Sequence, residues 1–155
     1  MASPTGALLK AIRNASLGVK VDRATQALPQ TTNYSLFTVT GGRVILTSIV
    51  GEVTTIIQTQ LDNAKLISTP TVGTAVDMCA VLNITAKEAG CLFGITGLPA
   101  DALVGTNAGL TTGMKQQLIL PAGTIKLDCS ASNTGAVKWT ITYVPIDDGA
   151  WVEAA

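Results

Sequence analysis

The sequence predicts an all-β protein, an antiparallel β-sandwich or barrel of jelly-roll type, with an extended N-terminal arm. Three observations support this prediction. From Tyr34 onward, apolar and polar residues alternate with a period of two, as in strands with one buried face. Turn-forming residues separate these runs at short spacing. Along the 155 residues we find no repeat of fixed period and no alternation of helical with strand patterns.

The segment 36–57, LFTVTGGRVILTSIVGEVTTII, is dense in Val, Ile, Leu and Thr, which suit a half-buried pleated surface. Gly41 and Gly42 predict a tight turn after a short strand. Gly51 predicts a kink or bulge in the long strand that follows. We expect the rest of the β domain to be organised around this segment.

Four further segments alternate with the strand period, namely residues 76–84, 91–96, 124–129 and 137–143. The last two are joined by SASNTGA at 130–136, which is rich in turn formers. They are expected to form an antiparallel hairpin in which Trp139 packs near Leu127. Residues 99–113 are rich in Gly, Ala and Thr and predict a long loop, with room for one helical turn at 100–104.

The pattern divides the chain into an arm, residues 1–35, and a β domain, residues 36–155, that ends in an acidic tail from about residue 145. A short helix is expected at residues 6–15, followed by a polar, unpatterned stretch in which Pro29 interrupts regular structure. The arm has four basic residues against one acid, and the tail has three acids and no base.

Both ends are candidates for binding another protein rather than only being solvated tails. Apolar side chains in an arm with no core of its own favour docking, and a lone aromatic residue in a tail is a suitable anchor. The arm candidates are Leu8, Leu9, Lys10, Ile12, Arg13, Lys20 and Arg23, and the tail candidates are Asp147, Asp148, Trp151 and Val152.

The composition favours a chain that other protein covers. Hydrophobic residues make up 47% of the chain, charged residues only 13%, and the net charge is zero, so self-association meets little electrostatic resistance. No apolar run reaches the roughly 18 residues of a membrane span, and 4% aromatic residues is few for the girdles of an outer-membrane protein. The apolar patch at 7–12 is too short for a secretion signal.

The three cysteines, Cys79, Cys91 and Cys129, have no CxxC spacing. They are expected to be buried free thiols, with one disulfide and one free thiol as the alternative.

No catalytic, metal-binding or cofactor-binding residue is predicted. The chain has no histidine, which removes His-dependent nucleophilic catalysis and His-ligated zinc, and it has no phosphate-binding motif. An enzyme without histidine would have to use acids such as Glu52, Asp77 and Asp128, which have no distinctive context. Balanced charge argues against nucleic-acid binding. A sugar-binding sandwich that uses Trp151 stays open.

The phrases LFTVTGGRVILTSIVGEVTTIIQTQ and LPAGTIKLDCSASNTGAVKWTITYVPIDDGAWVEAA resemble small β-rich structural proteins of tailed bacteriophage virions, over roughly residue 36 to the end. The resemblance implies a capsid decoration, or cement, protein that clamps neighbouring major capsid subunits. It would be made in the host cytoplasm and placed on the outer surface of the capsid. A head-fibre or tail accessory protein that binds a host glycan or another virion protein is the alternative. Copies of the chain are expected to associate, as a trimer first and a dimer next.

Overall fold

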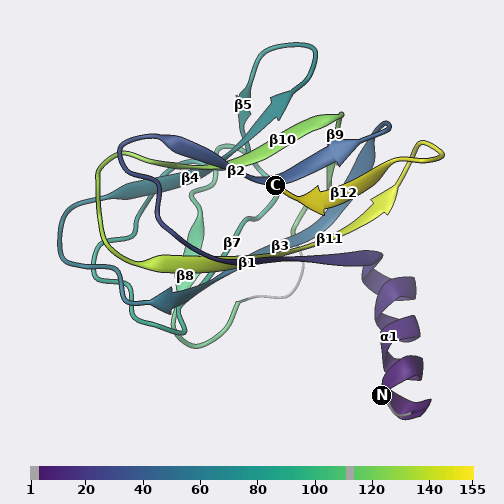
Figure 1. Ribbon diagram of the computed structural model, residues 1–155, viewed down its shortest axis with the longest axis horizontal. Coiled ribbons are helices and arrows are strands. Elements are labelled where there is room, and N and C mark those ends of the chain that lie inside the picture. Colours follow the sequence, from purple (N-terminus) through teal and green to yellow (C-terminus); the bar gives the residue numbers. More distant parts are fainter. Residues whose placement is uncertain (1–3, 111–113) are drawn as a thin grey trace.

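Two antiparallel sheets packed face to face form the body of the protein (Figure 1). The computed structural model describes residues 4–110 and 114–155. Sheet A contains β1 (Val19–Ala27), β3 (Val44–Thr55), β7 (Leu92–Gly94), β8 (Val104–Thr106), β9 (Leu118–Leu120) and β11 (Ala136–Pro145). Sheet B contains β2 (Asn33–Thr40), β4 (Asn63–Pro70), β5 (Val76–Asp77), β6 (Leu82–Asn83), β10 (Gly123–Cys129) and β12 (Trp151–Ala154). The predicted antiparallel sandwich is confirmed.

Most strand pairs join segments that are far apart in the sequence. The order in sheet A is β1-β11-β3-β7-β8, with β9 also paired to β3, and in sheet B it is β12-β2-β10-β4-β5, with β6 also paired to β4. The chain passes from one sheet to the other at each step from β1 to β4 and again from β9 to β12. The first two strands therefore pair with strands from the end of the chain.

The predicted hairpin of residues 124–129 and 137–143 is wrong. β10 belongs to sheet B, where it pairs with β2 and β4, whereas β11 belongs to sheet A, where it pairs with β1 and β3. Each of the two strands has one apolar face, and residues 130–135 cross the sandwich so that the two faces meet in the core. Leu127 and Trp139 are accordingly both core residues, on opposite sheets.

The arm is shorter than the sequence pattern indicates, because residues 19–27 form β1. This strand pairs with β11 from Val19 opposite Tyr143 to Ala27 opposite Ala136, and its register shifts between Arg23 and Gln26. Both faces of this edge strand are largely exposed, so its sequence lacks the alternation that marks a half-buried strand. The boundary between arm and β domain therefore lies at Gly18 rather than at residue 35.

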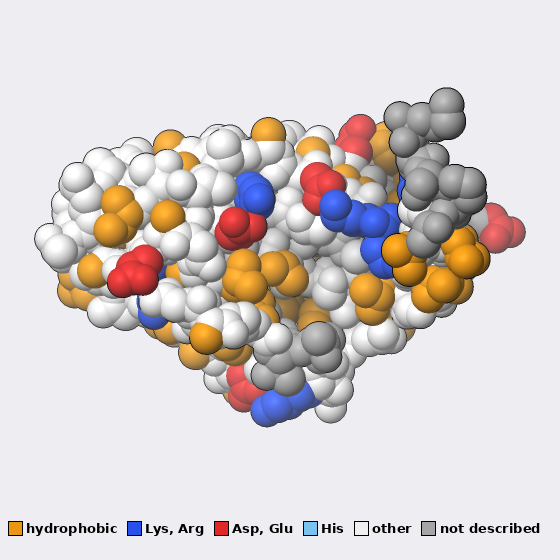
Figure 2. All heavy atoms as spheres, turned by 90° about the horizontal axis from the view of Figure 1, so that it is seen from below, with side chains coloured by type: hydrophobic (Ala, Val, Ile, Leu, Met, Phe, Trp, Pro, Cys, Tyr) orange, Lys and Arg blue, Asp and Glu red, His pale blue; other side chains and the backbone are white. Residues whose placement is uncertain are grey.

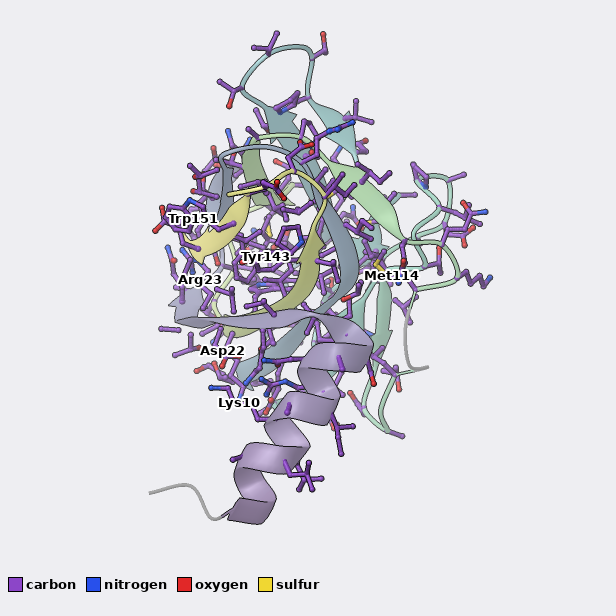
Figure 3. The ribbon with its side chains drawn as sticks, turned by 90° about the vertical axis from the view of Figure 1, so that its right-hand side faces the viewer. Lys10, Asp22, Arg23, Met114, Tyr143 and Trp151 are labelled. Carbon is purple, nitrogen blue, oxygen red and sulfur yellow. The ribbon has the colours of Figure 1, made fainter. Side chains whose placement is uncertain are left out.

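Helix α1 (Pro4–Leu17) extends beyond the predicted range 6–15 at both ends and projects from the sandwich (Figures 1 and 3). It ends at Gly18, which has a φ of +87° and whose N–H donates to the carbonyl of Asn14 over 2.9 Å. A glycine in this conformation just after the last turn is a common helix terminator.

The acidic C-terminus is not a free tail. β12 pairs with β2, from Trp151 opposite Thr40 to Ala154 opposite Phe37, so the last residues complete the edge of sheet B. The tail prediction failed because four residues with a single buried side chain make too short a pattern to read as a strand.

Residues 76–84 do not form one long strand. Within this segment, only the short strands β5 and β6 pair with β4, and Ala80, which lies between them, makes an isolated bridge to Ala102. Val76 is exposed, whereas Met78 and Ile84 are buried. Among the described residues of the predicted 99–113 loop, 100–103 contain a turn and the Ala102 bridge rather than a helical turn, and β8 begins at Val104. Residues 111–113 lie outside the described residues.

Gly51 does not mark a bulge. The register shifts between β3 and β11 fall elsewhere, at Ala136/Val137 and at Thr142/Tyr143. Gly51 lies opposite Trp139 in the ladder, and a Cβ at this position would be 2.9 Å from atoms of the indole ring. The glycine is required because the ring occupies the space of a side chain.

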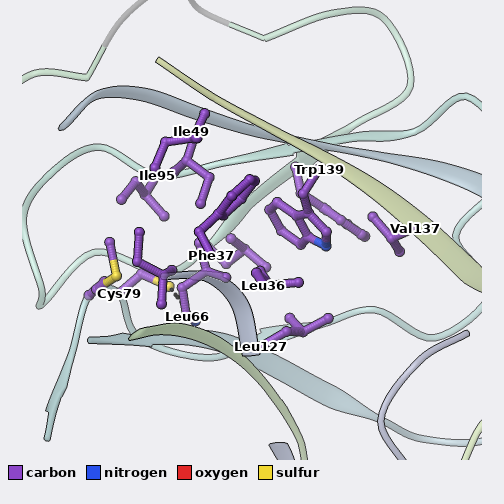
Figure 4. Close-up of a cluster of buried hydrophobic side chains, with 14 of the residues drawn as sticks. Leu36, Phe37, Ile49, Leu66, Cys79, Ile95, Leu127, Val137 and Trp139 are labelled. Atoms are coloured by element: carbon purple, nitrogen blue, oxygen red, sulfur yellow. Dashed lines mark hydrogen bonds between the residues drawn. The ribbon is translucent and has the colours of Figure 1, made fainter. Parts of the chain in front are cut away.

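The core lies between the two sheets and is centred on Trp139 (Figure 4). The rings of Trp139 and Phe93 stack with centroids 6.3 Å apart, and Leu36, Phe37 and Leu127 are also fully buried. The three cysteines are free and buried, as predicted. Burial raises the pKa of each thiol, which keeps the thiols in the unreactive protonated form.

Candidate protein-binding surface

Helix α1 presents an apolar face to solvent. Leu8, Leu9 and Ile12 are 61%, 60% and 54% exposed. Successive residues of a helix are turned by about 100°, so these three side chains lie on one side with Ala15, while Lys10 points to the opposite side. Figure 2 shows hydrophobic side chains gathered at the right-hand end of the molecule, the end from which α1 projects in Figure 1. We call Leu8, Leu9, Ile12 and Ala15 the α1 stripe.

The C-terminal end of α1, which we call its root, is anchored to sheet A, although the α1 stripe is exposed to solvent. A Cβ on Gly18 would lie 2.0 Å from the carbonyl oxygen of Tyr143, so this position accepts only glycine. The carbonyl of Leu17 accepts a hydrogen bond from Thr47 Oγ1 over 2.5 Å, and Thr47 Oγ1 lies 2.6 Å from Thr142 Oγ1. These contacts fix the direction in which α1 leaves sheet A.

The basic residues predicted for the arm do not gather on the α1 stripe. The Arg13 guanidinium donates to Asn14 Oδ1 from Nε and Nη2, over 3.2 and 2.9 Å. Lys20, on β1, forms an ion pair with Asp22 at 2.7 Å, and this contact, with the hydroxyl of Thr140, lowers the pKa of the Asp22 carboxyl. Lys20 is therefore part of the surface of the sandwich.

Arg23 closes the edge between the two sheets rather than extending along an arm. Its Nη2 donates to the carbonyl of Ser35 over 3.1 Å, and its guanidinium lies 5.1 Å from the centre of the Tyr34 ring. Tyr34 is half-buried, and burial raises the pKa of its hydroxyl to about 12. Arg23 thus ties β1 to β2 across the sandwich.

The four tail candidates also have separate environments. Asp147 accepts three hydrogen bonds of 2.7–2.9 Å from the guanidinium and backbone N–H of Arg43, which lowers the pKa of the Asp147 carboxyl to about 2. Asp148 is exposed. On β12, Trp151 is 43% exposed and Val152 only 4%. Burial of Val152 against the core contradicts its prediction as a partner-binding residue.

A second apolar surface, which the sequence analysis missed, crosses the outer face of sheet A beside the helix root. In the ladders, Val144 lies opposite Ile45 and Ile45 lies opposite Ile119, so the three side chains form a row across β11, β3 and β9. Val144 and Ile119 are exposed and Ile45 is half-buried. A Cβ on Gly18 would be 2.8 Å from Val144 Cγ2, so the row begins at the root of α1. We call these three residues the sheet row.

Beyond β9, the sheet row continues into an apolar pocket of about 250 Å³. The pocket is lined by Ile119 and Leu118 from β9 and, across the end of the sandwich, by Val76 and Met78. In the sequence, the signal for the sheet row and the pocket was a pair of apolar runs, Val44–Leu46 and Leu118–Leu120. Each run has three successive apolar residues with no polar residue between them. Such runs place apolar side chains on both faces of a strand.

A buried carboxylate lies in the loops at the start of β4. Asp62 is fully buried, and its Oδ1 accepts from the Ala131 N–H over 3.1 Å and from Ser130 Oγ over 3.4 Å. Its Oδ2 has no hydrogen-bond partner within the structure. Burial raises the pKa of the Asp62 carboxyl, and its hydrogen bonds oppose this shift only in part.

We expect the variant Asp62→Asn to gain stability relative to the wild type as pH rises from about 4 to about 7. The pKa of Asp62 is higher in the folded than in the unfolded state, so its favourable contribution is present at low pH and is lost as pH rises through the folded-state pKa. Asparagine keeps an oxygen acceptor for Ala131 and carries no charge. Urea denaturation across this pH range measures the difference, and a pH-independent difference would contradict the expectation.

No family model, curated protein or solved structure matches this chain. The resemblance to phage structural proteins therefore stays a prediction. Within residues 4–110 and 114–155, no helix is long and apolar enough to cross a membrane. Over the same ranges, no group of three or more His, Cys, Asp or Glu side chains is arranged to hold a metal ion.

Proposed function

We propose that this chain is a non-enzymatic structural protein of a phage virion, a capsid decoration protein that attaches to neighbouring capsid subunits from the outer surface. The observation that carries the proposal is the α1 stripe, an apolar helix face held in a fixed direction by Gly18 and Thr47 yet left uncovered by the chain's own sandwich. A helix of 14 residues gains most of its stability from packing, so this face is expected to pack against other protein.

The sandwich suits the role of a rigid platform. Its N-terminal and C-terminal strands interlock in both sheets, so each copy presents the same surface in the same geometry. Decoration of a shell needs complementary area rather than chemistry, and copies bound on a lattice gain avidity because later contacts are effectively intramolecular. Low charge allows close approach between copies.

The proposal is tested by adding the purified chain to shells that lack it and imaging the particles by electron cryomicroscopy. We expect ordered density for the sandwich on the outer surface. Ile12→Glu places a charge in the α1 stripe and is expected to weaken attachment by roughly 30-fold or more, as for a hot-spot side chain worth ~2 kcal/mol. Lys10→Glu, on the opposite side of the helix, is the control and should attach normally. Shells that stay undecorated by the wild type would refute the proposal.

A sugar-binding accessory protein is the second candidate, favoured by the exposed Trp151 on edge strand β12. Exposed aromatic side chains commonly stack on sugars. Trp139, the other tryptophan, is buried and should not respond, so a change in tryptophan fluorescence on adding host glycans would report Trp151. This response, together with failure to decorate shells, would favour the second candidate.

A further inference from the structure

Two bare apolar surfaces meet at one corner of the molecule. Helix α1, which carries the α1 stripe, extends from the N-terminal end of β1 (Figure 3). The sheet row starts beside Gly18, at the root of the same helix. The helix does not cover its own row, because Leu8, Leu9 and Ile12 remain more than half exposed and the Gly18 junction fixes the direction of α1. Each copy therefore carries both halves of an apolar contact, and the two halves are not joined within the chain.

The two surfaces match in length. Seven residues separate Leu8 from Ala15, which at 1.5 Å per residue gives a stripe of about 10 Å. The sheet row spans two strand spacings, from β11 through β3 to β9, which at about 4.8 Å each also gives about 10 Å. Beyond Ile119, the pocket of about 250 Å³ offers room for a further side chain from the helix.

The charges of the helix are compatible with contact between identical chains. Lys10 lies opposite the α1 stripe, and Arg13 is turned toward Asn14 with its guanidinium engaged there. Neither base would be buried when the stripe is covered, so two copies could approach without placing like charges in the contact. The exposed side chains of the sheet row are aliphatic and have no charge to pair with these bases.

We propose that the partner of the α1 stripe is a second copy of this chain, in a two-fold symmetric dimer in which each helix packs on the sheet row of the other copy. A single two-fold axis places each α1 stripe on the sheet row of the other copy. The dimer is therefore a closed assembly that adds no further copies through these surfaces. This inference deepens the proposed function and rests on it only in treating α1 as a surface for protein. The loop end of the sandwich, where Ile56 and Leu61 are exposed, then contacts the shell, and Ile12→Glu weakens shell attachment because a monomer lacks the avidity of the dimer.

The dimer is tested on the free protein by sedimentation across the micromolar range, in the absence of particles. The wild type should sediment as a dimer, and Ile12→Glu on the helix and Ile119→Glu on the row should each raise the dissociation constant by 30-fold or more. Lys10→Glu and Val104→Glu are controls on the helix and on sheet A, and both should remain dimeric. Circular dichroism confirms that each variant is folded. A monomeric wild type would overturn the inference even if shells are decorated.

Cross-linking tests the geometry without relying on disruptive variants. The native cysteines are buried, so cysteines introduced at the surface dominate mild oxidation. A mixture of the single variants Ile12→Cys and Ile119→Cys should yield a covalent dimer that contains one chain of each. Cross-linking of Ile12→Cys with itself in place of the mixed product would show helix-to-helix pairing and overturn the proposed contact, as would a trimer in sedimentation of the wild type.

Discussion

Replacing Trp139 by alanine is expected to lower the free energy of unfolding by about 3–5 kcal/mol, a large part of the stability of a domain of this size. The indole is 1% exposed, stacks on Phe93, and fills the space that Gly51 leaves open on the neighbouring strand. Alanine would leave a cavity between two sheets whose backbones are fixed by their ladders, so the core cannot collapse fully to fill it. Urea denaturation followed by circular dichroism measures the loss.

Trp151→Ala is the matched control, since it removes the same side chain from an exposed position on β12. Its effect on the free energy of unfolding should stay within about 1 kcal/mol, as is usual for surface substitutions. Equal losses for the two variants would contradict the arrangement in which the core is centred on Trp139.

The sequence was sufficient to predict strands that have one buried face. The alternation in residues 124–129 and 137–143 placed β10 and β11 within two residues of their observed ends, because burial on one face leaves a period of two. The same reasoning could not predict β1, whose position depends on its ladder with β11 and whose side chains are largely exposed. Backbone hydrogen bonds stabilise such a strand and leave no hydrophobic pattern in the sequence.

Pairing was harder to predict than strand location. The turn formers at 130–136 indicated a reversal, but a reversal can join neighbours within a sheet or cross from one sheet to the other. The distinction depends on contacts such as β11 with β3 and β10 with β2, which join residues far apart in sequence. For the candidate surface, the sequence identified Leu8, Leu9 and Ile12, whereas the sheet row became visible only when the registers of three strands were known.

The interlocked order of the strands also determines how many N-terminal residues can be deleted before the sandwich loses stability. A chain that begins at Gly18 lacks α1 and is expected to keep nearly the full stability of the sandwich, because Leu8, Leu9 and Ile12 are exposed and the helix is bonded to the body at Leu17. It should lose dimerisation, since the α1 stripe is gone. This chain separates the role of the helix in association from any role in folding.

A chain that begins at Asn33 is expected to unfold or aggregate. It loses β1, which pairs with β11 at seven positions, and the buried side chain of Leu28. With net values of ~0.5–1.5 kcal/mol per hydrogen bond and ~1.5–3 kcal/mol for a buried leucine, the loss is several kcal/mol. It would also expose the long edge of β11 to pairing with other chains. Circular dichroism and sedimentation of the two chains, side by side with the full chain, measure both effects. If the shorter chain melts at the same temperature as the chain that begins at Gly18, β1 is dispensable and the boundary between arm and β domain does not lie at Gly18.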